Sequence, residues 1–205
     1  MDLKTHKVVR ELARKGIVEQ LVWSPDGKWF VGTANGLGQF WNIGLVHGTT
    51  GEVRALSETE RYNCTPDWAP DSQHVVYARG IIPEKGGHAE LWIASINGKE
   101  RFRAYAEPDH HIYGACVSPD GKYLLFTRSV ADLGRVNGTT MAIIRCPDLT
   151  HPATNSNSGV VMLPRIDLEP GWEPHWTQSA PGAAWNLIIL SDGNQNHHES
   201  SSSAR

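Results

Sequence analysis

Two separate segments of this sequence contain side chains that could ligate a metal ion. His110 and His111 are adjacent, and Glu173 and His175 lie near the C-terminus. Imidazole nitrogens and carboxylate oxygens together bind zinc and related divalent metals. Against a metal site, these residues show no His-x-x-x-His spacing, and most of the ten histidines are expected at the surface or in ordinary hydrogen bonds. His110, His111 and His175 are therefore candidate ligands only, and we predict no resident metal and no cofactor.

Arginine and tryptophan residues accompany these histidines and predict a binding rim. Arg79 and Arg128 follow positions 68 and 117 by the same number of residues, so both should occupy the same place in successive repeats. A nucleophile elbow, a zincin motif and a phosphate-binding glycine loop are absent, because the glycine-rich run 32–38 precedes no helix. We expect the following side chains to converge on one face: Arg61, Arg79, His110, His111, Arg128, Trp172, Glu173 and His175.

The elements that would position these side chains repeat along the chain. The motif Trp-Ser-Pro-Asp-Gly-Lys at 23–28 returns in altered form at 68–73 and 117–122, with a degenerate copy at 175–177. Proline fixes φ, aspartate bonds its own backbone and glycine accepts positive φ, so each copy predicts a hairpin tip. Strand-like runs flank each tip, and repeats of about 50 residues built from short strands are typical of propeller blades. The predicted turn residues are Pro25, Asp26, Gly27, Pro70, Asp71, Pro119, Asp120 and Gly121.

The fold class is therefore all-β: a β-propeller with about four blades' worth of four-stranded antiparallel sheets. Thr5 to Leu12 is interpreted as the outer strand of a preceding blade. Ser72 replaces glycine at the second tip and should adopt positive φ, so Ser72→Gly is expected to stabilise the fold slightly. The blades are predicted at about 17–56, 62–105, 112–163 and from 171 onward, within a domain spanning 1–192. The third strands of the first three blades are expected at 38–43, 89–94 and 140–145. The polar segment 193–205 is expected to be disordered.

Composition excludes several partner classes. The net charge is −3 and the pI is near 6.3, so no basic field attracts nucleic acid. No apolar run is long enough to insert into a membrane, and the first residues lack the apolar core of a secretory signal, which predicts a cytoplasmic protein for the sequence as written. Cys64, Cys116 and Cys146 form no Cys-x-x-Cys pair and indicate free thiols.

The Ser-Pro-Asp-Gly-Lys tips followed by apolar strands resemble the WD40-like repeat called PD40, which is found in TolB-like β-propellers. The resemblance covers residues 5–192 and implies a six- or seven-bladed ring, and a periplasmic or extracellular location for a full-length parent. The same sequence group includes oligogalacturonate lyases, which cleave glycans with a His-based metal site at the mouth of the channel.

Two function classes follow from these observations. The first is a non-catalytic interaction module that binds a protein or glycan through its loop face. The second is a glycan-active enzyme with a metal at the histidines named above. Because rings in the family are larger than four blades, we expect an open arc whose strand edges are completed by a homodimer or a longer parent chain.

Overall fold

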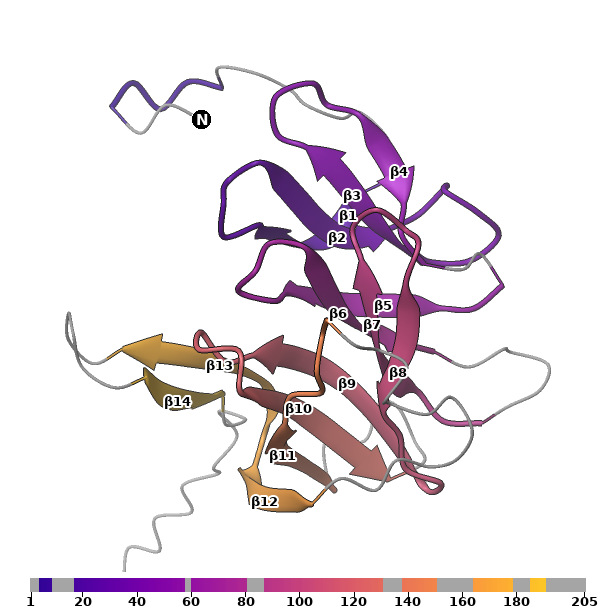
Figure 1. The fold of residues 1–205 in the computed structure, drawn as a ribbon, viewed down its shortest axis with the longest axis vertical. Coiled ribbons are helices and arrows are strands. Elements are labelled where there is room, and N and C mark those ends of the chain that lie inside the picture. The colour runs from indigo at the N-terminus through magenta and orange to yellow at the C-terminus, as the bar shows by residue number, and fades with distance from the viewer. Residues whose placement is uncertain are drawn as a thin grey trace, which may run out of the picture.

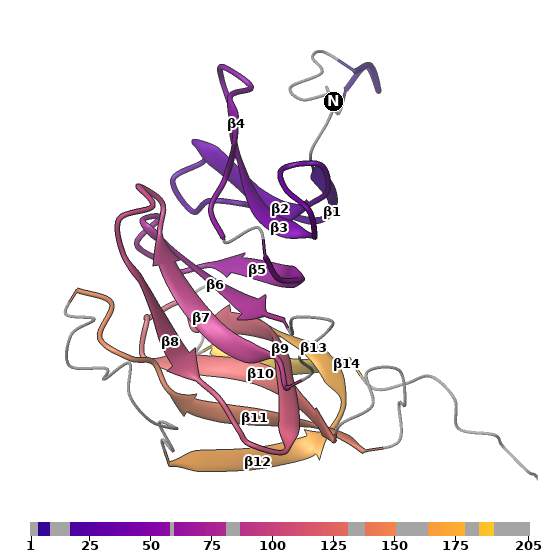
Figure 2. The same ribbon diagram turned by 90° about the vertical axis from the view of Figure 1, so that its right-hand side faces the viewer.

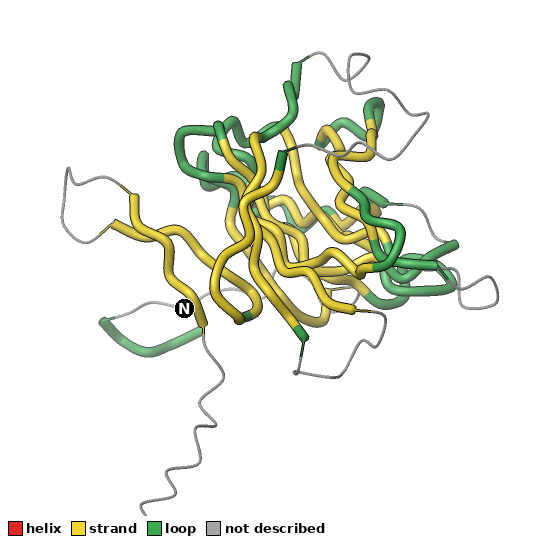
Figure 3. The backbone as a smooth tube through the Cα atoms, turned by 90° about the horizontal axis from the view of Figure 1, so that it is seen from below, coloured by secondary structure: helices red, strands yellow, loops and turns green. Residues whose placement is uncertain are grey.

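The computed structural model describes residues 4–8, 17–57, 60–80, 87–130, 138–150, 164–178 and 185–190. Within these ranges the chain is all-β and contains no helix, as the strands and connecting loops of Figure 3 show. Three four-stranded antiparallel sheets and one two-stranded sheet follow one another along the chain. Each sheet corresponds to one predicted blade, which confirms the β-propeller architecture.

Within each complete blade, consecutive strands are neighbours in the sheet. Blade one contains β1 (Ile17–Trp23), β2 (Trp29–Ala34), β3 (Asn42–His47) and β4 (Val53–Ala55). Blade two contains β5 (Asn63–Trp68), β6 (His74–Arg79), β7 (Glu90–Ser95) and β8 (Arg101–Tyr105). Blade three contains β9 (His110–Val117), β10 (Tyr123–Val130), β11 (Thr139–Arg145) and β12 (Arg165–Pro170), and blade four contains β13 (Trp172–Gln178) and β14 (Trp185–Leu190).

The repeated motif forms the hairpin tips between the first two strands of blades one, two and three. In the first tip Gly27 N–H donates to Ser24 C=O at 2.9 Å, and Gly27 takes a φ of 71°. The Ser24 hydroxyl donates to Asp26 Oδ1 at 2.7 Å and accepts the Trp29 N–H at 3.0 Å. Ser118 and Asp120 repeat this arrangement in the third tip. Serine and aspartate thus bond backbone and side-chain groups within the first and third tips, whereas Ala69 takes the serine's place in the second tip.

A β-bulge interrupts the inner strand of each complete blade at an equivalent position. The residues with positive φ there are Gln20, Thr65 and Gly114, and the strand register shifts around each of them. The bulges also join the blades, because Thr65 N–H donates to Gln20 Oε1 at 3.0 Å and Gly114 N–H donates to Thr65 Oγ1 at 3.1 Å. The inner strands are therefore held together at their bulges.

The hydrophobic core lies between the blades. Blade one packs Val31 and Leu45 against Trp68 and Tyr77 of blade two. Blade two packs a second cluster, which includes Tyr105, against blade three, where Phe126 is fully buried. In Figure 2 blades one, two and three follow one another from top to bottom as stacked sheets.

Three sequence-based boundaries are wrong. Residues 5–8 of the expected outer strand form a turn and a loop, and residues 9–12 lie outside the described part. The third strand of blade one is Asn42–His47 rather than 38–43, because Ile43 and Leu45, not the preceding aromatic pair, fill the core against blade two. Blade three continues past residue 163 to the outer strand β12, which ends at Pro170. The expected tail at 193–205 also lies outside the described residues.

The blades form an open arc rather than a closed ring. Among the described strands, no pairing joins blade one to β13 or β14. Residues 4–8 lie at the top of Figure 1, above blade one, whereas β13 and β14 lie lower in the picture. Blade one therefore presents a sheet face that no described blade covers, with Leu21 and Trp23 more than half exposed.

Candidate functional site

The antiparallel topology gives the arc two opposite rims. The tips at 24–28, 69–73 and 118–122 lie on one rim. The starts of the inner strands and the ends of the second strands lie on the other, which we call the loop rim. Here consecutive blades are joined by backbone bonds: Asn63 N–H donates to Trp41 C=O at 3.0 Å, and Ile112 N–H donates to Ala89 C=O at 2.9 Å.

An exposed aromatic group lies on the loop rim where blades one and two meet. Phe40 and Tyr62 have ring centroids 4.8 Å apart, and Trp41 and Tyr62 have centroids 5.7 Å apart at near right angles. Trp41 is 42% exposed and Tyr62 is 39% exposed. We call Phe40, Trp41, Arg61 and Tyr62 the rim cluster.

Arg61 completes the rim cluster with a positive charge. Its Nη1 donates to Gly80 C=O at 3.3 Å, and Gly80 N–H in turn donates to Tyr62 C=O at 2.7 Å. Arg61 makes no ion pair within the described residues. The residue that follows β6 therefore fixes the backbone of Tyr62 and orients Arg61. Among the described residues, no carboxylate pairs with this guanidinium, which lies beside two exposed aromatic rings.

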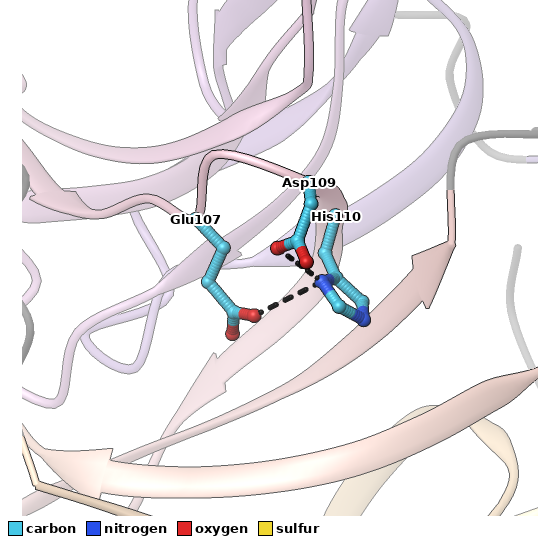
Figure 4. Close-up of side chains that lie close together, drawn as sticks. All are labelled: Glu107, Asp109 and His110. Carbon is cyan, nitrogen blue, oxygen red and sulfur yellow. Dashed lines mark hydrogen bonds and ion pairs between the residues drawn. The ribbon is translucent and has the colours of Figure 1, made fainter.

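A second group of predicted residues gathers around Glu107 at the start of β9. The Glu107 carboxylate is buried and accepts hydrogen bonds from Arg128 Nη2 at 2.7 Å, Arg165 Nη1 at 2.7 Å and the Tyr105 hydroxyl at 2.9 Å. His110 lies beside it, with Nδ1 at 2.7 Å from Asp109 Oδ1 and 3.3 Å from Glu107 Oε2 (Figure 4).

The charges in this group favour an internal ion-pair network over a metal site. Ligand atoms of Glu107, Asp109 and His110 lie within 4.8 Å of one another, close enough for one ion. Arg128 Nη2, however, lies only 3.1 Å from His110 Nε2 and also binds Glu107. Burial opposes ionisation of Glu107, but hydrogen bonds from Arg128 and Tyr105 outweigh it and lower its pKa. A divalent cation here would face two guanidinium groups that already neutralise the carboxylate.

The remaining predicted residues are divided among other environments. Arg79 occupies the position in blade two that Arg128 occupies in blade three. Its guanidinium carbon lies 4.3 Å from the centroid of the Trp92 ring, and its Nη1 lies 3.9 Å from Glu90 Oε2. His111 is buried, and its Nδ1 accepts the Ala89 N–H at 3.0 Å, so it faces the protein interior. His175 is exposed and lines a cavity between the inner strands.

The structure thus brings His110 and Arg128 into contact, with Arg61 and Arg79 on the neighbouring blade. The side chains of Trp172 and Glu173 lie outside the described residues. Sequence reasoning missed the aromatic members of the rim cluster, and it missed Glu107 and Arg165. The Phe40-Trp41 pair is a usable signal, because in the strand predicted at 38–43 the two adjacent rings would point to opposite faces and could not both enter one core.

Comparison with solved structures shows the fold. A TolB-type protein of Agrobacterium tumefaciens matches with a TM-score of 0.54 and 18% identity, over 65% of this chain and 47% of that one. TolB from Acinetobacter baumannii matches with a TM-score of 0.54 and 16% identity, over 76% of this chain and 33% of that one. The tricorn protease matches with a TM-score of 0.50 and 15% identity, over 82% of this chain and 18% of that one.

This chain spans less than half the length of each of these three structures. No protein-family model matches the sequence, and no curated protein matches it. The described residues also include no helix with the length and apolarity that crossing a bilayer requires.

Proposed function

We propose that this TolB-like β-propeller is a non-catalytic interaction module that binds a protein partner through the rim cluster. The observation that carries the proposal is the exposure of Trp41 and Tyr62 next to Arg61, whose charge no described carboxylate neutralises. Tryptophan, tyrosine and arginine are the residues most enriched at the energetic centres of protein interfaces. A complementary partner would present a carboxylate flanked by apolar side chains.

The rim cluster is also held in place before a partner arrives. The Asn63 N–H bond to Trp41 and the Gly80 N–H bond to Tyr62 fix both aromatic backbones. A prearranged surface loses less conformational freedom on binding, which favours affinity.

A glycan-active enzyme with a His-based metal site is the less supported alternative. Of its candidate ligands, His111 is buried with Nδ1 bound to the Ala89 N–H. His110 lies within a network in which Arg128 and Arg165 neutralise Glu107. Exposed aromatic rings also suit stacking on sugars, so a glycan partner is an outcome that the experiment must distinguish.

The test places a photo-crosslinking phenylalanine analogue at position 62 and, as a matched control, at position 123. Tyr123 follows a tip on the opposite rim and is 37% exposed, close to the 39% of Tyr62. In extracts of the source cells we expect a discrete protein adduct from position 62 and none from position 123.

The adduct's partner is then identified, and its binding to Trp41→Ala and Arg61→Gln is measured with the purified proteins. Each variant should weaken binding by at least tenfold, since centrally placed interface residues contribute about 2 kcal/mol or more. Equal crosslinking at both positions would refute the rim as a protein-binding surface. Binding on a glycan array that Trp41→Ala abolishes would instead assign the rim to glycans.

We further propose that the uncovered face of blade one is covered in the assembled protein by another blade, from a longer parent chain or a second copy. In the blade one–blade two contact, Trp68 is buried and its Nε1 donates to Val22 C=O at 3.0 Å. Trp23 occupies the same repeat position but is 52% exposed. A periplasmic or extracellular location of such an assembly is proposed from the family resemblance alone.

A further inference from the structure

A cavity of about 310 Å³ lies where the inner strands of all four blades approach one another. It is separate from the rim cluster, and none of the rim cluster residues lines it. Its volume is at the lower end of the range found for small-ligand pockets. Its walls come from β1, β5, β9 and β13 and are formed by Gln20, Leu21, Val22, Thr65, Pro66, Asp67, Gly114, Ala115, Cys116, Pro174 and His175.

Asp67 is the one carboxylate among the described residues of this wall. Its Oδ1 accepts the Trp68 N–H at 2.8 Å, and the Asp67 carboxylate makes no other hydrogen bond or ion pair within the described residues. Burial raises the pKa of Asp67 to about 7, and the hydrogen bond from Trp68 only partly opposes this effect. Among the described residues, no side chain or backbone N–H donates to Oδ2, so this oxygen is open to a ligand donor.

The other ionisable groups in the wall supply no fixed positive charge. Cys116 Sγ donates to Pro174 C=O at 3.1 Å, and burial, followed by the charge of Asp67, raises the thiol's pKa far above neutrality. His175 is exposed and makes no ion pair within the described part of the chain. Neither the β1 residues nor the other β5 residues in the wall are charged.

The bulges explain why Asp67 has this position. Thr65 takes a φ of 49°, and its backbone N–H and hydroxyl bond to blades one and three respectively. These bonds join the backbone at Thr65 to both neighbouring blades, and Asp67 follows two residues later in the same strand, at the cavity wall. A strained backbone retained by surrounding contacts is a common feature of ligand sites.

We propose that this cavity binds a primary ammonium group on an aliphatic stem, with Asp67 as its counter-ion. The ammonium would donate to Oδ2, and the methylenes would pack on the apolar side chains of Val22, Pro66 and Ala115. A compact ammonium needs one acceptor, which Oδ2 offers, whereas a guanidinium in a bidentate pair would share Oδ1 with the Trp68 N–H. A free alkylamine and a lysine side chain of a protein share this chemistry.

The test is a titration of the full chain with n-butylammonium. Binding is monitored through the carboxyl ¹³C resonance of Asp67 in protein labelled at its aspartates. We expect a saturable shift of this resonance and a lower apparent pKa of Asp67 in the bound state, because a nearby cation favours the carboxylate. Binding should weaken about 100-fold between pH 8 and pH 5 as the carboxylate takes up a proton.

Variants and a neutral ligand isolate the role of the charge. Because Asp67→Asn lacks the reporter carboxyl group, its butylammonium binding is measured by isothermal titration calorimetry alongside the wild type, and it should be at least tenfold weaker. Glu52→Gln removes one exposed carboxylate elsewhere and should leave binding unchanged. n-Butanol, which keeps the stem and lacks the charge, should bind at least tenfold more weakly than butylammonium. Equal binding to the wild type and Asp67→Asn, equal binding of butanol, or no saturable shift would overturn the proposal.

A parallel titration with a blocked Gly-Lys-Gly peptide distinguishes the two sources. Tighter binding of the peptide than of butylammonium would assign the cavity to a lysine of a protein partner, and weaker binding would assign it to a free amine. Because the wild-type Asp67 resonance reports directly on the site, the conclusion does not depend on how well the variant folds. Loss of partner binding in Trp41→Ala would leave this titration unaffected, so the two proposals can fail separately.

Discussion

Ser72 combines a strained backbone with a hydrogen bond between two tips. Its φ is 57°, as expected from its place in the repeat, and its Oγ accepts the Asp26 N–H of the first tip at 3.0 Å. The sequence alone predicted only the strain, and hence a stabilising Ser72→Gly. The hydrogen bond adds an opposing contribution of similar size, about 1 kcal/mol.

We therefore predict that Ser72→Ala destabilises the protein by about 1–2 kcal/mol, since it keeps the strain and loses the hydrogen bond. Ser72→Gly loses the same bond but relieves the strain, so its free energy of unfolding should stay within about 0.5 kcal/mol of the wild type. Urea denaturation of both variants measures the difference. Equal destabilisation by alanine and glycine would show that the positive φ costs nothing here.

Glu107 is the residue on which the blade-three ion-pair network depends. Because its pKa is lowered in the folded state, its ionisation stabilises the fold above the unfolded pKa, and this contribution is lost as pH falls through the folded value. Glu107→Gln should destabilise the protein by about 3 kcal/mol at pH 7, because Arg128 and Arg165 lose their shared counter-ion.

The difference between Glu107→Gln and the wild type should shrink as pH falls below the unfolded pKa of glutamate, about 4, and it should vanish only below the lowered pKa of Glu107 in the folded protein. Thermal melts across this pH range measure it. Glu52→Gln, at an exposed position, should remain within about 0.5 kcal/mol at every pH. A constant difference between Glu107→Gln and the wild type from pH 7 to pH 3 would contradict the charge-based explanation.

At the scale of strands and turns, Gly80 controls the junction between β6 and the rim cluster. A Cβ at this position would collide with the backbone carbonyl of Tyr62, which accepts the Gly80 N–H. Gly80→Ala should therefore destabilise the protein by about 2–3 kcal/mol. It should also weaken partner binding, because Tyr62 must move.

Gly98→Ala is the control for a glycine in open space. No atom lies within 4 Å of the position that a Cβ would take there, but the φ of 74° gives alanine a cost of about 1 kcal/mol. Guanidinium denaturation should rank Gly80→Ala as the more destabilising of the two. The reverse order would mean that the chain at residue 80 relaxes away from Tyr62 at little cost.

Element boundaries were predictable where an apolar pattern and a turn signal coincided. The strands on either side of the tips at 24–28 and 118–122 lie where the repeated motif predicts them. The third strand of blade one was misplaced because Phe40 and Trp41 resemble strand residues, although they lie on the loop rim. Local propensity favours aromatic residues in strands, and only packing against blade two decides which apolar residues pair.

At the scale of the whole molecule, the uncovered face of blade one determines how the arc associates. Trp23 is stacked on Phe30 with ring centroids 3.5 Å apart, yet more than half of it is exposed. We predict that Trp23→Ser reduces concentration-dependent self-association and changes the free energy of unfolding by about 1 kcal/mol or less. Sedimentation velocity over a range of concentrations measures the association.

Trp68→Ser tests the same repeat position inside the arc. Trp68 is 4% exposed and packs between blades one and two, so this variant should lose about 3–5 kcal/mol of stability. If Trp23→Ser self-associates as strongly as the wild type, the face of blade one is not the surface that joins copies of the chain.

The sequence by itself determined the blade repeat, its turn chemistry and the equivalence of Arg79 and Arg128, because these features depend on residues close together in the chain. Local φ preferences and strand alternation carry that information. Only the tertiary structure decided that Glu107 joins Arg128 and Arg165, that Tyr62 meets Phe40 and Trp41, and that Asp67 faces a cavity shared by four blades. Each of these arrangements joins separate turns or blades, and its geometry is set by the packing between sheets and by the bulges that bond one inner strand to the next.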